Sequence, residues 1–261
     1  MGIGIGEDNL FEVFENIVGR YVDAALAEVE KGSERDQEAI EALSGGGTDE
    51  NNRIQIVADW IRLYKVHRVK WSAREEDNDE AFADAVARQA INHFRTPHQD
   101  LSIPERYRML RAVIEEVYLS DPLRKERSFK SLTSKVLWCR YPEEVPIYDR
   151  FAVQSVTFLA KLYKSCVGFG RYALKIEEAT YSKEADNWDN MGSAERDWWW
   201  YRDFCHSHTT IYKVSEDAIR RHLVDRHRPE KMAFRTFDKI LWIMGNEDLD
   251  YSLMNVGWDR W

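Results

Sequence analysis

Apolar residues recur at intervals of three and four positions along most of the chain, which is the spacing of one buried face of an α-helix. Within residues 8–30, for example, Phe14, Val18, Tyr21 and Ala25 follow this period. The expected helices cover about 8–30, 34–44, 52–70, 79–95, 104–119, 128–140, 149–162, 195–204, 215–227 and 231–245. No segment shows the period-two alternation of a β-strand. The pattern therefore predicts an all-α fold with about ten helices.

Residues with known preferences for helix ends support several of these boundaries. Pro104 suits the first turn of a helix, where a missing backbone N–H is not needed. Asp149 and Ser215 each stand before an apolar-periodic run and suit an N-cap, and Gly245 suits a C-cap. These four residues predict three helix starts and one helix end.

The clearest break in the pattern is the segment SGGGT, residues 44–48. The helical residues before it are too few to bury a core of their own. We therefore expect residues 1–48 to form an appended helical arm and residues 49–261 to form one all-α domain.

The negative charge of the chain is concentrated in its first part. The net charge is −9, and residues 1–55 contain thirteen acidic and four basic residues, so residues 56–261 balance to zero. This distribution excludes a bulk electrostatic attraction for nucleic acid but is compatible with a basic groove on a neutral body. The acidic arm is expected to engage a protein partner.

The cysteines and the hydropathy predict a cytoplasmic protein. An odd, scattered set of three cysteines is not a disulfide framework. The first residues lack the basic and apolar regions of a secretory signal, and no window reaches the roughly twenty apolar residues of a membrane span. The run Cys205-His206-Ser207-His208 does not match a standard zinc site. We expect no metal, no cofactor and no membrane partner.

The segment SLTSKVLWCRYPEEVPIYDRF, residues 131–151, places a lysine and an aspartate where they could act together. Lys135 lies on the flank of an apolar helix stripe, where partial burial lowers the pKa of an amine. Two helices joined by a short loop pack antiparallel, so Asp149 is expected to return near Lys135. The positive end of the helix that Asp149 caps would keep its carboxylate ionised.

The same segment resembles the catalytic region of the helix-hairpin-helix DNA glycosylase superfamily, and most closely its 8-oxoguanine DNA glycosylase branch. The matching residues are Lys135, Val136, Cys139, Val145, Pro146 and Asp149. The resemblance implies a domain of that all-α type, acting in DNA repair or anti-phage defence. It implies that Lys135 forms a Schiff base with the sugar and that Asp149 stabilises the oxocarbenium-like sugar cation. The partner would be double-stranded DNA, with the target base, such as a modified one, flipped out of the duplex.

The residues around this pair are candidates for holding the DNA. Basic and hydroxyl side chains contact phosphates, and aromatic side chains stack on flipped bases. The candidate backbone contacts are Arg124, Lys125, Arg127, Lys130 and Ser134. We expect Trp138 and Tyr148 to line the pocket for the base.

Two other functions are compatible with the sequence. Arg220 and His227 are separated by six residues, a spacing that resembles the RNase motif of HEPN domains and would place both on one helix face. A non-enzymatic helical interaction module is the second alternative.

The three adjacent indoles of residues 198–200 point in different directions around a helix, so some must be core and an exposed one could stack on a base.

Overall fold

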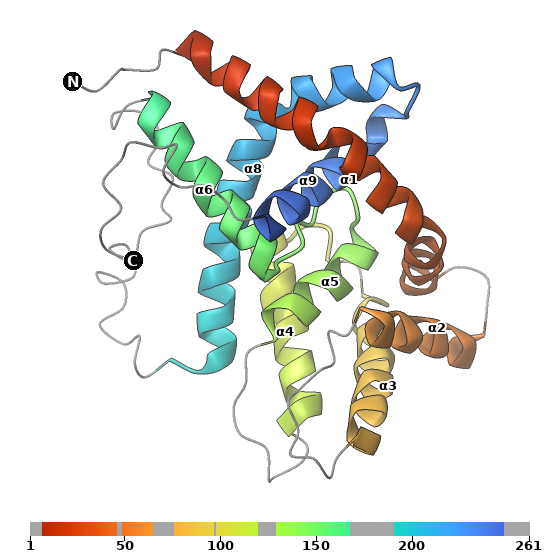
Figure 1. The fold of residues 1–261 in the computed structure, drawn as a ribbon. Coiled ribbons are helices and arrows are strands. Elements are labelled where there is room, and N and C mark those ends of the chain that lie inside the picture. Colours follow the sequence, from red (N-terminus) through yellow and green to blue (C-terminus); the bar gives the residue numbers. More distant parts are fainter. Residues whose placement is uncertain are drawn as a thin grey trace. The chain divides into compact units, whose positions relative to one another are not determined.

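The computed structural model describes residues 7–45, 49–64, 76–96, 98–119, 129–167 and 191–247. Every regular element in these ranges is a helix, which confirms the prediction of an all-α fold with about ten helices (Figure 1). The elements are α1 (Glu7–Ser44), α2 (Glu50–Leu63), α3 (Glu76–His93), α4 (Ile103–Leu119), α5 (Lys130–Arg140), α6 (Arg150–Val167), α8 (Ser193–Asp225), the 3-10 turn η2 (Glu230–Met232) and α9 (Ala233–Asn246). None of these helices has the length and apolar character that a membrane crossing requires.

The chain divides into two compact units, and two of the boundaries between them fall inside the long helices α1 and α8. Unit 1 contains residues 1–26, 150–176 and 207–261, and unit 2 contains residues 27–149 and 177–206. Helices α1 and α8 each contribute residues to both units. These units have other boundaries than the arm of residues 1–48 and the domain of residues 49–261. That division of the chain stays a prediction.

Unit 2 contains four helices that pack in chain order. Helix α2 packs against α3, α3 against α4, and α4 against α5 (Figure 1). Their facing sides carry the apolar residues that the helical period predicted. The largest fully buried aliphatic side chains are Ile61, Ile91, Leu110, Ile114, Leu132 and Leu137. Burying each such side chain contributes about 1.5–3 kcal/mol, so this shared core holds the four helices together.

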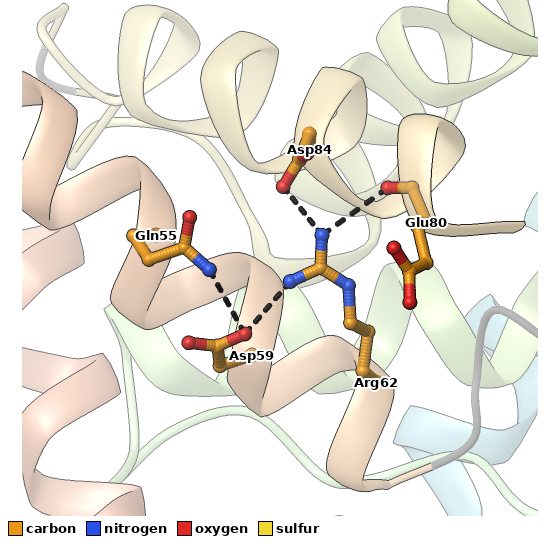
Figure 2. Close-up of polar contacts among 5 residues, drawn as sticks. All are labelled: Gln55, Asp59, Arg62, Glu80 and Asp84. Atoms are coloured by element: carbon orange, nitrogen blue, oxygen red, sulfur yellow. Dashed lines mark hydrogen bonds and ion pairs between the residues drawn. The ribbon is translucent and has the colours of Figure 1, made fainter. Parts of the chain in front are cut away.

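Arg62 adds a polar contact between α2 and α3. Figure 2 shows its guanidinium between Asp59 on its own helix and Asp84 on α3, each with an N–O distance of 2.7 Å. The Nη2 atom of Arg62, which contacts Asp84, also donates to the carbonyl oxygen of Glu80 at 3.3 Å. Asp59 also accepts from the amide of Gln55 at 3.0 Å. The network fixes the last turn of α2 against the first half of α3.

Unit 1 contains a close approach between α6 and α9. The Ser155 hydroxyl donates to the carbonyl oxygen of Leu241 at 2.6 Å. A Cβ atom added to Gly245 would lie 2.0 Å from the carbonyl oxygen of Phe151, which is far inside van der Waals contact. Gly245 was expected to cap α9, but α9 continues to Asn246 and Glu247 is its C-cap residue. This glycine instead lets two helix backbones come together.

Two other expected helix boundaries are wrong. Helix α1 is continuous through residues 31–33, where the sequence suggested a break. Ser215 was expected to begin a helix but lies well inside α8. Its hydroxyl donates to the carbonyl oxygen of Ile211 at 2.9 Å, which is how a serine in a helix interior satisfies its donor.

Replacing Gly245 should test the close approach of α6 and α9. We expect Gly245→Ala to lower the free energy of unfolding by about 1–3 kcal/mol, because the added methyl group must push the two backbones apart. Urea unfolding followed by tryptophan fluorescence measures the change.

Gly19→Ala is the matched control. It lies in helix α1, and the nearest atom to an added Cβ is 3.5 Å away, an ordinary contact. We expect it to stabilise the protein by up to about 1 kcal/mol, because alanine favours a helix over glycine. Equal effects of the two substitutions would contradict the close approach.

Candidate functional site

A buried ion pair holds the start of α5, the helix that carries the candidate lysine. Phe129, the N-cap residue of α5, provides no side-chain cap. Its backbone N–H instead donates to Asp197 Oδ2 of α8 at 3.0 Å. The same oxygen accepts from Arg111 Nε of α4 at 2.9 Å, and the two charged side chains are 0% and 4% exposed. A carboxylate at this position satisfies an open helix donor and favours the positive end of the helix.

The connection after α5 returns to the same helix through a serine. The Ser134 hydroxyl accepts a hydrogen bond from the backbone N–H of Tyr148 at 3.0 Å and donates to the carbonyl oxygen of Ser131 at 3.1 Å. Ser134 precedes Lys135, and Tyr148 precedes Asp149, which directly precedes the first residue of α6. The hydrogen bond therefore brings the backbones beside the two candidate catalytic positions together.

Lys135 lies beside a group of aromatic residues. Its side chain is half-buried, and its Nζ atom is 5.8 Å from the centre of the Tyr64 ring. The distance is within the range of a cation–π contact. Trp138, one turn further on, is buried and stacks on Trp60 at 6.4 Å between ring centres. Trp138 thus lies on the buried side of α5, against Trp60 of α2.

A second lysine lies between two aromatic rings at the start of α5. The Nζ atom of Lys130 is 5.3 Å from the ring centre of Tyr148 and 5.4 Å from that of Trp200. Burial lowers the pKa of the Lys130 amine, and the charge of Asp197 opposes this shift. Burial, followed by the same charge, raises the pKa of Tyr148 to about 12, so its phenol stays neutral. Trp200 is 37% exposed, so this end of the site reaches the surface.

Of the five predicted contacts with the DNA backbone, the structure describes Lys130 and Ser134. Arg124, Lys125 and Arg127 lie outside the described residues. Ser134 is fully buried and its hydroxyl holds the loop, which corrects its expected role as a phosphate contact. Lys130 and the rest of the predicted site lie in unit 2.

Sequence reasoning missed several residues of this site. They are Asp36, Tyr64, Arg111, Asp197 and the exposed member of the indole run, Trp200. Only Trp200 could have been identified from the sequence, because three adjacent indoles cannot all be buried on one helix face. The others come from separate helices, and their contacts depend on tertiary packing.

The residues of the RNase alternative do not share a helix face. Helix α8 ends at Asp225, and His227 lies beyond it with a φ angle of 54°. Arg220 contacts Glu216 at 2.7 Å and Glu230 at 2.9 Å. The helical geometry expected for this pair is therefore wrong.

The histidines of the earlier Cys-His run are also separated. His208 is buried and contacts Asp238 at 2.9 Å, whereas His206 is exposed. Within the described ranges, no group of three or more histidine, cysteine or acidic side chains is placed to hold a metal ion.

Comparison of the chain with family models, with curated proteins and with solved structures finds no match. Function must therefore be inferred from the geometry of the site.

The buried ion pair predicts a large effect of Asp197→Asn. Removing this charge leaves the buried Arg111 with only the longer contact to Glu115, at 3.6 Å, which we expect to cost up to about 3–5 kcal/mol of unfolding free energy. Asp203→Asn, on the same helix, removes the partner of the part-exposed Arg202 and should cost less than about 1 kcal/mol. Urea unfolding measures the free energy of unfolding of both variants. Equal losses would show that the buried pair with Arg111 contributes no more than the part-exposed pair with Arg202.

The environment of Lys130 predicts an unusual titration. Because burial disfavours the charged form, Lys130 should lose its proton at a lower pH than the exposed Lys213. NMR of reductively ¹³C-methylated protein, assigned with a Lys130→Arg variant, measures both. Identical titration midpoints would contradict the desolvated position.

Proposed function

We propose that unit 2 binds duplex DNA and acts as a DNA N-glycosylase on a base flipped out at the end of α5. The hydrogen bond between Tyr148 and Ser134, at 3.0 Å, is the observation that carries the proposal. It supports a common site for Lys135 and Asp149, because each follows directly after one of the two bonded residues. The sequence resemblance assigns chemistry to this same pair.

The reaction needs a charge beside the sugar when the base leaves. As the bond from C1′ to the base breaks, the base takes the electron pair and the sugar becomes cationic. The carboxylate of Asp149 stabilises that cation, and the positive end of α6 keeps the carboxylate ionised. A water molecule then bonds to C1′ and its proton reaches the departing base. Alternatively, the neutral Lys135 amine bonds to C1′ and gives one proton to the departing base. The C1′–O4′ bond then breaks, O4′ takes its electron pair and the second amine proton, and a covalent imine remains.

The second lysine and the exposed indole supply contacts for the DNA. Lys130 carries a positive charge that suits a phosphate, and Trp200 offers a partly exposed ring on which a base can stack. Two acidic residues of α1 are paired with basic residues within unit 1. There Asp23 forms an ion pair with Arg226 at 2.5 Å, and Glu15 forms one with Arg221.

The RNase alternative has weaker support. Arg220, which would have to stabilise a phosphate, is already held between two glutamates.

Base release from duplexes that each carry one modified base tests the proposal. We expect release from at least one duplex, with Asp149→Asn lowering the rate by about 100-fold. Borohydride reduction should trap a covalent adduct with abasic duplex in the wild type but not in Lys135→Ala if the imine route is used.

Asp217→Asn and Lys213→Ala, at exposed positions of α8, are the matched controls and should behave as the wild type. Absence of base release and of an adduct, together with no preference for abasic duplex in binding, would overturn the proposal. Tight binding without release would restrict it to base recognition.

A further inference from the structure

Asp36 on α1 carries a buried carboxylate that Trp60 of α2 and Tyr64, the C-cap residue of α2, hold in place. The residue is 6% exposed, and its Oδ1 atom accepts hydrogen bonds from Trp60 Nε1 at 3.0 Å and from the Tyr64 hydroxyl at 2.5 Å. A buried carboxylate is unfavourable unless its oxygens are hydrogen-bonded, and bonds to a charged acceptor are the stronger kind. Asp36 therefore fixes the orientation of both rings.

The rings of Trp60 and Tyr64 both contact residues of α5 in the candidate site. The Trp60 ring stacks on Trp138 with an interplanar angle of 17°, and the Tyr64 ring lies 5.8 Å from Lys135 Nζ. Lys135 and Trp138 are three residues apart on α5, so they are neighbours on the helix surface. One carboxylate on α1 thus orients the aromatic side of α5 that includes the candidate lysine.

Gly32 keeps the space that this arrangement needs. A Cβ atom added there would lie 3.3 Å from both Asp36 Oδ2 and the Tyr64 hydroxyl, closer than ordinary contact. Glycine weakens a helix interior relative to nearly every other residue. Its presence in the middle of α1 is explained by the phenol that occupies the space of a side chain.

We propose that Asp36 and Tyr64 are positioning residues for Lys135. Asp36 holds the Tyr64 ring, and the face of that ring holds the ammonium group of Lys135 beside the segment that contains Asp149. The inference rests on the proposed function, in which the Lys135 side chain acts at the sugar of the flipped nucleotide. Residues 27–44 of α1 then contribute to the site rather than serving only as an acidic arm.

The placement of Lys135 can be measured without DNA. We expect Tyr64→Leu to raise the rate at which an amine-reactive ester labels Lys135 by about threefold, because the ring that holds the ammonium is lost. Tyr64→Phe and Asp36→Asn should raise it less, since the ring remains but is no longer fixed. Mass spectrometry of peptides gives the rate, with Lys31, whose side chain is 78% exposed, as the internal reference.

Tyr21→Phe is the matched control variant. It lies on the same helix and removes a comparable hydrogen bond, from the tyrosine hydroxyl to Glu247 at 2.8 Å. It should leave the labelling of Lys135 unchanged. An unchanged rate in Tyr64→Leu, or an equal rise in Tyr21→Phe, would overturn the positioning role.

A double-mutant cycle then connects the placement to DNA. Tyr64→Leu and Lys135→Ala should each weaken binding to a duplex with a tetrahydrofuran abasic analogue, by about fivefold, and the double variant should lose no more than Lys135→Ala alone. Losses that multiply would contradict positioning through Lys135. If the wild type binds no duplex, the proposed function fails, while the labelling experiment still decides the positioning.

Discussion

The contact between Arg111 and Asp197 joins three helices of unit 2 at one point. Neither side chain has appreciable access to water, so the Asp197 carboxylate depends on Arg111, and Arg111 depends on Asp197 together with the longer contact to Glu115. Asp197 also accepts the backbone N–H of Phe129, which the sequence of α5 leaves without a cap of its own. Helices α4 and α8 therefore determine where α5 begins. The direction in which α5 presents its two lysines follows from that start.

The features of the candidate site are consequences of this fixed helix. Ser134 can accept the N–H of Tyr148 only because α5 holds it toward the returning loop. The Tyr201 hydroxyl of α8 donates to the carbonyl oxygen of Pro146 at 3.1 Å and fixes the same loop from a second helix. Two lysines then lie beside aromatic rings, each in partly buried surroundings. Such a combination of cations and rings suits a phosphate and a base together.

Local patterns predicted the all-α fold class, because the apolar period depends on residues close in sequence, whereas the central pair of the site stays a prediction. The apolar period defines the buried face of each helix, and the lysine and aspartate lie on adjoining elements. Local rules failed where a distant residue decides the structure. Gly32 normally favours a break, but Tyr64, the C-cap residue of α2, occupies the space beside it. Gly245 normally marks a helix end, but the backbone of Phe151 requires its missing side chain. No local pattern connects Asp197 with the start of α5.

Disulfide trapping tests most directly whether the end of the loop between α5 and α6, at Asp149, receives a nucleotide. An Asp149→Cys variant would be incubated with duplexes that carry a thiol tether on an extruded nucleotide or on a paired nucleotide one helical turn away. The wild type measures the background from Cys139, Cys166 and Cys205. The proposed site predicts a crosslink to the extruded nucleotide that clearly exceeds both the crosslink to the paired nucleotide and that of an Asp217→Cys control. Equal crosslinking in all of these pairs would contradict it.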